Sequence, residues 1–446
     1  MQIKKFLKRI KIPIDIQDNV DYKRITIRIN HQGISLRDIV KGVVIGTKKQ
    51  FKVSSGLFLL SKIDARYGAF GIIPAEANDA IITGNFWAYE VDTNIIDIEW
   101  FNQYTNSKYF YQICEDASSG ITHRKYLDEK SFLDHDIVLP SLEKQKKQIN
   151  DIKVFKTKIN SVNTELNHQL ELVKKLRQSL LQDAVQGKLL PPQTTNGGKV
   201  EHAADLLQQI KAEKEKLIAE KKIKKEKPLP PIKPEEIPFE IPSNWVWCRL
   251  GEITLHSQAG KSFKASELPA NLGQLGVIKT SAITTGIFLE NENKSLPNNV
   301  DDYSTIKISK GDLIFCRASG SKGLAGKSCI VTNLINSNLI LSDKSIRYLF
   351  PSNINKTFVH IVNISTYGES YYHRLGTKKS TSMNNITREQ FDMLPIPLPP
   401  YSFQNATVNN LDKLLKYCDN IETSIKASQQ LNQQLTQQVL SELLQP

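Results

Sequence analysis

The stretch Ala318–Cys329, ASGSKGLAGKSC, carries the residue types that hold phosphate in nucleotide-binding loops. It is rich in glycine, contains a Gly-Lys-Ser triplet and follows the apolar run Leu313–Phe315. A phosphate-binding loop needs four residues between its first glycine and the Gly-Lys pair, so that backbone amides wrap the phosphates. Ser321 stands at that first position, whereas Gly320 leaves five intervening residues and Gly323 leaves two. The spacing therefore predicts a structural turn, and we expect no ATP binding by this chain.

No other catalytic or metal-binding signature is found. The chain lacks the [DNS]-P-P-[YFW] tetrapeptide of adenine methyltransferases, and it lacks G-x-G-x-x-G, H-E-x-x-H and G-x-S-x-G. Its five cysteines form no C-x-x-C pair and have no accompanying histidine cluster: Cys114, Cys248, Cys316, Cys329 and Cys418. We expect a non-catalytic protein that itself holds no cofactor and no metal, in the reducing cytoplasm.

Size and charge point to a multidomain protein with a polyanionic partner. A chain of 446 residues is long enough for about two to four domains. No apolar run approaches the ~18–20 residues that cross a bilayer, and the basic N-terminal stretch has no apolar core, so neither a signal peptide nor a membrane anchor is expected. The formal net charge of +13 favours nucleic acid as the partner.

The chain contains an internal repeat. Gly33 and Gly286 are 253 residues apart within similar stretches, and three further glycine pairs are 255 apart: Gly56/Gly311, Gly68/Gly323 and Gly71/Gly326. Glycines in matching register predict turns at equivalent places. The stretch Ile63–Ile73 keeps the glycines of the phosphate-loop-like segment but has Ile-Ile where Lys327 and Ser328 stand, so that lysine is local to one copy.

Each copy ends in a long amphipathic segment without internal proline or glycine, 143–186 and 402–444, and these segments align at an offset of 259. Apolar residues recur there at three- and four-residue steps, which predicts helices about 60 Å long. Packing the two helices together, as an antiparallel coiled coil, is the simplest way to bury both stripes. The alternative, in which each helix packs on its own domain, stays open.

These patterns predict an α+β protein with internal pseudo-two-fold duplication: two mixed α/β domains separated by two long helices packed as an antiparallel coiled coil. The expected divisions are a first domain (1–142), a first spacer helix (143–188), a linker (189–236), a second domain (237–401) and a second spacer helix (402–446). Within the linker, Glu201–Lys227 predicts a short exposed helix. Pro228–Pro242 predicts an extended connection that runs from the linker into the second domain.

Four segments carry a resemblance to a known family: Ile241–Ile253 (IPSNWVWCRLGEI), Leu59–Gly71, Leu176–Leu189 and Ser380–Pro399. With the repeat, they make the chain similar to the DNA-specificity subunit of a Type I restriction-modification system. The first copy shows no counterpart of IPSNWVWCRLGEI, which leaves the start of the first domain open.

The resemblance implies two target-recognition domains, each reading one half of a bipartite, asymmetric site in double-stranded DNA. It also implies that the helices set the spacer and dock two methyltransferase subunits, which bind S-adenosylmethionine and methylate adenine. Restriction subunits, which use ATP and Mg²⁺, would join that core to translocate and cleave DNA. The specificity subunit performs no chemistry in such a complex.

DNA contacts require cationic and polar side chains presented on loops and at element ends. The candidates in the first domain are Lys48, Lys49, Lys62, Arg66, Arg124 and Lys125, and those in the second are Lys261, Lys264, Lys279, Arg317, Ser319, Lys322, Arg374, Lys378 and Lys379. The basic loops 118–125 and 376–383 occupy equivalent places in the two copies, so we expect them to contribute affinity.

Two other functions remain open from the sequence. One is the specificity subunit of a related system in which methylation and cleavage share a single partner polypeptide. The other is a non-specific DNA-binding coiled-coil scaffold protein, which would explain the charge and the helices but not two diverged copies of a mixed domain.

Overall fold

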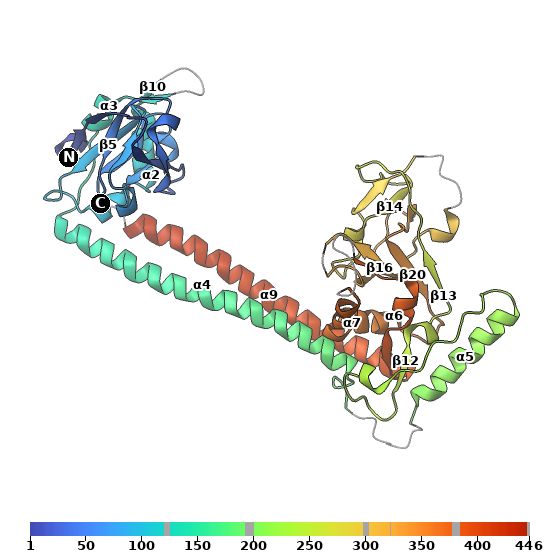
Figure 1. Cartoon of the computed structure of the whole chain (residues 1–446). Coiled ribbons are helices and arrows are strands. Elements are labelled where there is room, and N and C mark those ends of the chain that lie inside the picture. Colours follow the sequence, from blue (N-terminus) through green and yellow to red (C-terminus); the bar gives the residue numbers. More distant parts are fainter. Residues whose placement is uncertain (120–124, 192–199, 298–302, 322, 377–383, 444–446) are drawn as a thin grey trace. The chain divides into compact units, whose positions relative to one another are not determined.

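In a computed structural model of the chain (Figure 1), the structure describes residues 1–119, 125–191, 200–297, 303–321, 323–376 and 384–443. The chain divides into two compact units. Unit 1 comprises Met1–Asn167 and Lys426–Pro446, and unit 2 comprises His168–Ile425. Both predicted long helices are confirmed as α4 (Leu142–Val185) and α9 (Tyr401–Leu443), and each contributes residues to both units.

Unit 1 is built on two sheets. The first is antiparallel, in the order β1 (Leu7–Ile10), β9 (Phe86–Val91), β6 (Phe58–Ser61), β7 (Phe70–Ile72). The second has the order β2 (Ile12–Asp15), β5 (Lys49–Val53), β8 (Ala80–Ile82), β3 (Asp21–Ile27), β4 (Ile34–Lys41). Helices α1 (Ile98–Tyr104), α2 (Lys108–Asp116) and α3 (Glu129–Asp134) share an aromatic core with the first sheet, in which Phe58, Trp100 and Phe110 are fully buried. Strands β10 (Ser118–Ser119) and β11 (Tyr126–Leu127) form a short pair.

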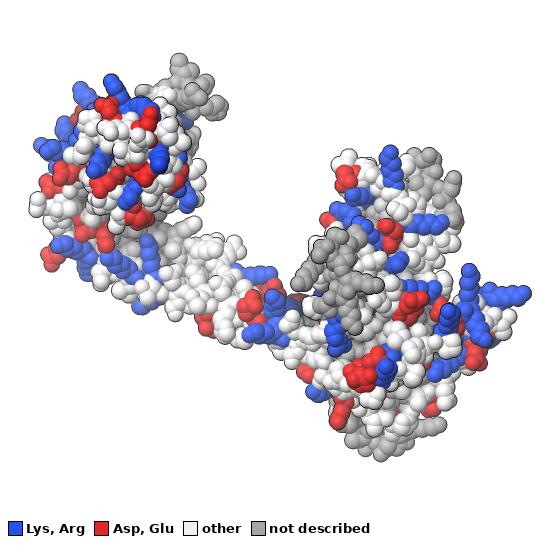
Figure 2. Space-filling model, viewed as in Figure 1, with Lys and Arg blue, Asp and Glu red and all other residues white. Residues whose placement is uncertain are grey.

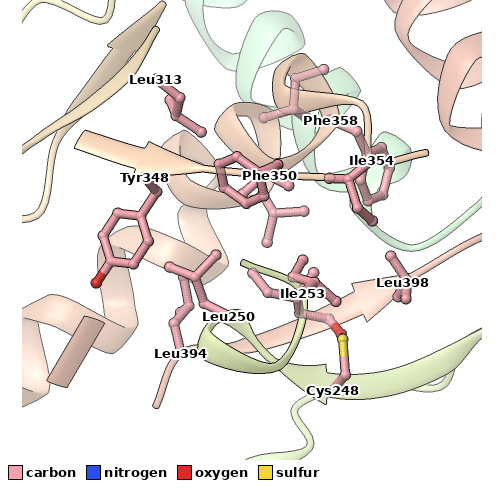
Figure 3. Close-up of a cluster of buried hydrophobic side chains, with 14 of the residues drawn as sticks. Cys248, Leu250, Ile253, Leu313, Tyr348, Phe350, Ile354, Phe358, Leu394 and Leu398 are labelled. Carbon is pink, nitrogen blue, oxygen red and sulfur yellow. The ribbon is translucent and has the colours of Figure 1, made fainter. Parts of the chain in front are cut away.

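Unit 2 has a four-stranded antiparallel sheet in the order β13 (His256–Ala259), β20 (Ser345–Leu349), β16 (Leu313–Cys316), β18 (Ser328–Ile330). A second sheet has the order β15 (Asn293–Ser295), β14 (Gly276–Ile278), β19 (Leu339–Ile340). Two short pairs join β12 (Val246–Arg249) to β22 (Pro395–Leu398) and β17 (Ala318–Ser319) to β21 (Asn384–Asn385). The helices are α5 (Ala203–Ala219), α6 (Lys356–Ile364), α7 (Thr366–Gly376) and α8 (Arg388–Asp392). Figure 3 shows part of the core, a cluster of buried side chains that includes Leu313, Tyr348 and Phe358.

The four-stranded sheets of the two units have the same strand order and polarity. Strands β6 and β16 occupy the same interior place and begin 255 residues apart, at Phe58 and Leu313. Three of the aligned glycine pairs also share a left-handed backbone: φ is 81° and 82° at Gly33 and Gly286, 84° and 85° at Gly56 and Gly311, and 79° and 78° at Gly68 and Gly323. The fourth pair differs, because Gly71 lies within β7 whereas Gly326 has φ 93°.

Strand pairing shows how the first domain begins, a point that the sequence leaves open. Gln2 forms an antiparallel bridge with Asp136, and β1 then pairs with β9. In unit 2, Arg249 pairs with Pro395 and β13 pairs with β20 in the same way. Residues 2–10 are therefore the counterpart of the latter part of the segment around IPSNWVWCRLGEI. The identity of the side chains differs, so the equivalence lies in strand pairing.

The linker prediction is corrected. Helix α5 was expected to be exposed, but Ala203, Leu206 and Ile210 are buried in the core of unit 2. The proline-rich connection is fastened by the Arg249 side chain, which is 1% exposed. Its guanidinium forms two hydrogen bonds to the Glu236 carboxylate, both 2.8 Å, and donates to the carbonyls of Pro230, Pro231 and Met393. The segment is thus integral to unit 2.

A buried glutamine attaches the start of each long helix to its globular domain. Gln145 in α4 is fully buried; its Oε1 accepts from the Asp97 N–H at 2.7 Å, and its Nε2 donates to the Pro140 carbonyl at 2.8 Å. Because Asp97 is the N-cap of α1, this amide links two helix starts.

The same bonds recur in unit 2, 259 residues later. Gln404 in α9 is fully buried; its Oε1 accepts from the Asn355 N–H at 2.8 Å, and its Nε2 donates to the Pro399 carbonyl at 2.9 Å. Asn355 is the N-cap of α6. A buried amide with both groups satisfied at fixed geometry holds the helix in one orientation relative to its own domain.

The two long helices contact each other within each unit, in antiparallel order. In unit 1, the Asn163 side chain of α4 accepts a hydrogen bond from Asn432 Nδ2 of α9 at 2.6 Å. About one turn later in α4, Asn167 accepts from Gln429 Nε2 at 2.9 Å, and Gln429 precedes Asn432 in α9. The two helices therefore run in opposite directions. In unit 2, Arg177 Nη2 donates to Asp419 Oδ1 at 2.7 Å and Glu422 Oε2 at 3.1 Å.

The Gly-Lys-Ser triplet of the phosphate-loop-like segment is occupied by contacts within unit 2. Lys327 forms an ion pair with Glu369. Ser328 is fully buried in β18, where its hydroxyl bonds His360 Nδ1 and accepts from Asn363 Nδ2, both at 2.9 Å. Burial lowers the pKa of His360 to about 4, although a hydrogen bond to the backbone of Gly286 acts in the opposite direction. The imidazole is therefore neutral in the folded protein at pH 7.

Replacing Gln404 with leucine should destabilise unit 2. The substitution leaves the Asn355 N–H and the Pro399 carbonyl without their partner, at a cost of about 1–3 kcal/mol for each orphaned group. Denaturant unfolding measures the loss. Asn409→Ala, at an exposed position of the same helix, is the matched control and should change the free energy of unfolding by less than about 0.5 kcal/mol. Equal stabilities of the two variants would contradict the role given to Gln404.

His360 should make unit 2 sensitive to acid. The pKa of His360 is lower in the folded state than the ordinary 6.5. Its contribution to the free energy of unfolding is therefore complete above pH 6.5 and is lost as pH falls toward 4. Between pH 7 and pH 5 this loss amounts to about 2 kcal/mol. His360→Gln should flatten the pH dependence of unfolding in that window, whereas His373→Gln, at an exposed position in α7, should leave it unchanged. Parallel curves for wild type and His360→Gln would refute the assignment.

Candidate nucleic-acid interface

One of the two interior strands of each four-stranded sheet is followed directly by a cationic residue. In unit 1, Lys62 follows β6. Its N–H donates to the Asn85 carbonyl at 2.9 Å, and its own carbonyl accepts from the Leu127 N–H at 2.8 Å. Both backbone groups of Lys62 are thus fixed, one by the segment before β9 and one by β11.

Arg317 follows β16 in unit 2 and is held in the same way. Its N–H donates to the Lys344 carbonyl at 2.7 Å, and its carbonyl accepts from the Ile386 N–H at 2.8 Å. The partners Asn85 and Lys344 are 259 residues apart, as are Leu127 and Ile386, which is the offset of the long helices. The two cations therefore occupy one equivalent backbone position.

The surroundings of Lys62 are aromatic and cationic. Its Nζ lies 5.7 Å from the ring centroid of Tyr126, which is 43% exposed. Arg66, in the short turn Ala65–Tyr67, stacks on Tyr67 with its guanidinium carbon 4.5 Å from the ring centroid. Arg66 also borders an open depression of about 450 Å³, whose other lining residues are Asn106, Lys108, Tyr111, Gln112 and Glu115.

Around Arg317, polar residues of β17 and β21 are brought together. Asn385 of β21 pairs with Ala318 and is exposed, and Lys344 is exposed as well. Ser319 is 6% exposed, and its hydroxyl accepts from the Ser321 N–H at 3.1 Å, so an internal donor occupies it. Arg317 Nε is buried and has no hydrogen-bond acceptor among the described residues.

Several other candidate cations already have internal partners. Lys48 pairs with Asp18 at 2.6 Å, Lys125 with Glu115 at 2.6 Å, and Lys279 with Glu292 at 2.7 Å. Four further candidates are exposed: Lys49, Lys261, Lys264 and Arg374. Lys261 forms an isolated parallel β-bridge with Ser342, and Arg374 lies in the last turn of α7. Arg124, Lys322, Lys378 and Lys379 lie outside the described residues. All fifteen remain predictions as DNA contacts.

Four residues that the sequence reading did not select lie beside the two strand ends: Asn85 and Tyr126 in unit 1, and Lys344 and Asn385 in unit 2. No local pattern marks them, because they reach the site from hairpins and strands that are distant along the chain.

Charge is mixed over the visible surface, and Figure 2 shows Lys and Arg interspersed with Asp and Glu. Among the described residues, no group of three or more His, Cys, Asp or Glu side chains is placed to hold a metal ion, and all five cysteines are unpaired and buried. Within that same part of the chain, no helix has the length and apolar character to cross a membrane.

Comparison with known proteins finds similarity to one family in the C-terminal half of the chain. Residues 242–433 match the family model of the Type I restriction modification DNA specificity domain. The chain is 35% identical over 257 residues to the specificity subunit of the Type I restriction enzyme EcoEI of Escherichia coli. It is 31% identical over 258 residues to that of EcoAI, also of Escherichia coli. Each match covers 57% of this chain and 42% of the relative, so the matched region is less than half of each relative's length.

Two solved structures share the fold over the whole chain. One is a chain of a type I R-M system solved for its complex assembly and conformational transition, with a TM-score of 0.60, 13% identity and coverage of 100% of this chain and 97% of that one. The other is the HsdS subunit from Thermoanaerobacter tengcongensis, with a TM-score of 0.54, 13% identity and coverage of 100% and 95%. The resemblance to Type I specificity subunits inferred from the sequence is confirmed.

Proposed function

We propose that this chain is the DNA-recognition subunit of a Type I restriction-modification complex, in which each unit reads one half of a bipartite, asymmetric DNA site. The observation that carries the proposal is the matched architecture of the units: the same strand order, with a cation fixed at the same strand end in each. The specificity-domain match over residues 242–433 supports the same conclusion for unit 2. Diverged side chains on a shared framework suit two different half-sites.

The duplication is part of this proposal. It is supported by the shared left-handed glycines, by the repeated glutamine bonds at the starts of α4 and α9, and by matching helix caps. For example, the Ser107 hydroxyl accepts from the Phe110 N–H and the Ser365 hydroxyl from the Gly368 N–H, each at 3.3 Å. The domain divisions expected from the sequence remain proposals; the contact-based units differ from them because each takes part of both long helices.

The long helices would form the antiparallel coiled coil that sets the spacer between half-sites. Antiparallel hydrogen bonds within each unit and the absence of proline and glycine from both helices support this role. A continuous helix rises about 1.5 Å per residue, so its length fixes a distance that a flexible linker would not.

The same helices carry apolar positions suited to partner docking. In unit 1, Val162, Leu431 and Leu435 are 47%, 66% and 45% exposed. The equivalent positions in unit 2, each 259 residues away, are Ile421, Leu172 and Leu176, at 45%, 48% and 44%. The leucines of each set are four residues apart and so share a helix face. Two equivalent apolar sets fit two copies of one partner, which we take to be the methyltransferase subunit.

Catalysis and cofactors belong to the partners in this proposal. The methyltransferase subunits would bind S-adenosylmethionine and methylate adenine, and restriction subunits would use ATP and Mg²⁺ to translocate and cleave DNA. The complex would work in the cytoplasm, which suits five unpaired thiols. A partner that combines methylation and cleavage in one polypeptide is the second candidate, and separate methyltransferase and translocase genes beside this one would favour Type I.

Methylome sequencing tests the proposed function. Co-expression of the chain with its methyltransferase in a host without adenine methylation should produce methylated adenine confined to one two-part motif. The methyltransferase alone should leave that motif unmodified. Methylation that persists unchanged without the chain, or that lacks a two-part motif, would refute the role of a specificity subunit and favour a non-specific scaffold.

Docking on the helices has its own test. Leu431→Glu with Leu435→Glu should weaken binding of one methyltransferase subunit by at least about tenfold, because a carboxylate replaces buried apolar contacts. Native mass spectrometry should then record one bound subunit per chain instead of two, and Leu172→Glu with Leu176→Glu should have the same effect. Gln433→Glu with Gln437→Glu, at exposed positions on the opposite face of α9, is the charge-matched control. Two bound subunits in every variant would exclude these surfaces.

A further inference from the structure

Lys62 and Arg317 differ from Lys48, Lys125 and Lys279 in their internal contacts. Lys125 and Lys279 are neutralised by carboxylates at 2.6 Å and 2.7 Å. Among the described residues, neither Lys62 nor Arg317 has an acidic partner, and Arg317 Nε lacks any acceptor. Both residues are half-buried. A cation that no internal carboxylate neutralises is ready for an external acceptor.

The backbone beneath these side chains is fixed more firmly than that of a surface loop. At both positions the N–H and the carbonyl are hydrogen-bonded, within 2.7–2.9 Å, to segments on either side of the strand end. Side chains anchored on rigid strand ends hold their geometry more precisely than side chains on loops. Such precision is needed to recognise a base edge, whereas a phosphate contact tolerates a mobile ammonium group.

We propose that Lys62 and Arg317 are the matched base-reading residues of the two half-sites, each donating to the O6 and N7 edge of a guanine in the major groove. This inference rests on the proposed function and assigns one specificity determinant to each unit. Guanine is the natural target because it alone presents two adjacent acceptors in the major groove. The Arg317 guanidinium can donate to both at once through its planar fork, whereas the Lys62 ammonium is a point donor.

The neighbours of the two cations extend the reading surface in different ways. Exposed Tyr126 beside Lys62 offers an apolar ring, and exposed Asn385 beside Arg317 offers an amide that can pair with adenine. The two units therefore place the same kind of anchor next to different chemistry. That difference is what an asymmetric bipartite site requires.

The test is methylome sequencing of substituted chains co-expressed with the methyltransferase. Arg317→Ala should relax one position of one half of the motif and lower methylation of the original site by about 10- to 100-fold, while the other half stays as strict as before. Lys62→Ala should relax one position in the opposite half. Arg317→Lys keeps the charge but loses the fork, so it should also relax that position, which a phosphate contact would not do.

Lys41→Ala and Lys310→Ala, at exposed positions in units 1 and 2, are the matched charge controls and should leave the motif unchanged. Thermal unfolding of each variant separates misfolding from altered reading, since a misfolded chain loses both halves together. If Lys62→Ala and Arg317→Ala keep every position of the motif strict, whatever their methylation rates, the inference is overturned while the proposed function stands. If the wild-type chain directs methylation to no two-part motif, both the proposed function and this inference are refuted.

Discussion

The buried amides of Gln145 and Gln404 are the constraint on which the proposed reading geometry depends. Each satisfies a backbone N–H at a helix cap and a proline carbonyl just before a long helix, in a place that water does not reach. Rotation of the helix relative to its domain would break both bonds and leave buried polar groups unpaired. The direction in which α4 or α9 leaves its own domain is thereby fixed by hydrogen bonding as well as by apolar packing.

A second set of buried polar contacts, those of Arg249, makes the proline-rich connection Pro228–Pro242 part of unit 2. Arg249 is nearly inaccessible, and its guanidinium is satisfied by one carboxylate and three carbonyls. A buried guanidinium is tolerated only when its donors are paired in this way, so the proline-rich segment and Arg249 stabilise each other. Together with α5, whose apolar face packs on the core, this arrangement extends unit 2 beyond the sheet that carries Arg317.

The two strand ends illustrate how one framework carries two different sets of surface side chains. Lys62 and Arg317 have equivalent backbone partners, which are 259 residues apart in the two units, while the side chains around them differ. Backbone hydrogen bonds do not depend on side-chain identity, so the framework can persist while the chemistry at its surface diverges. A protein that must distinguish two half-sites benefits from that separation, because a change at Tyr126 or Asn385 does not disturb the strand that supports the cation.

The sequence by itself determined the features that local patterns encode. Uninterrupted apolar periodicity predicted both long helices, aligned glycines predicted turns at equivalent places, three of whose four pairs share a left-handed backbone, and the joint motifs indicated the family. The sequence could predict these features because helix formation and a positive φ depend on residues that are close together along the chain.

Only the tertiary structure decided which cations remain available. Lys48, Lys125 and Lys279 are paired with carboxylates that lie 30, 10 and 13 residues away in the sequence, and spacing alone does not reveal such partners. The same holds for the packed face of α5, for the pairing of residues 2–10 with the first sheet, and for the equivalence of Lys62 and Arg317. Each depends on contacts between segments that are distant along the chain, and those contacts exist only once the domains have folded.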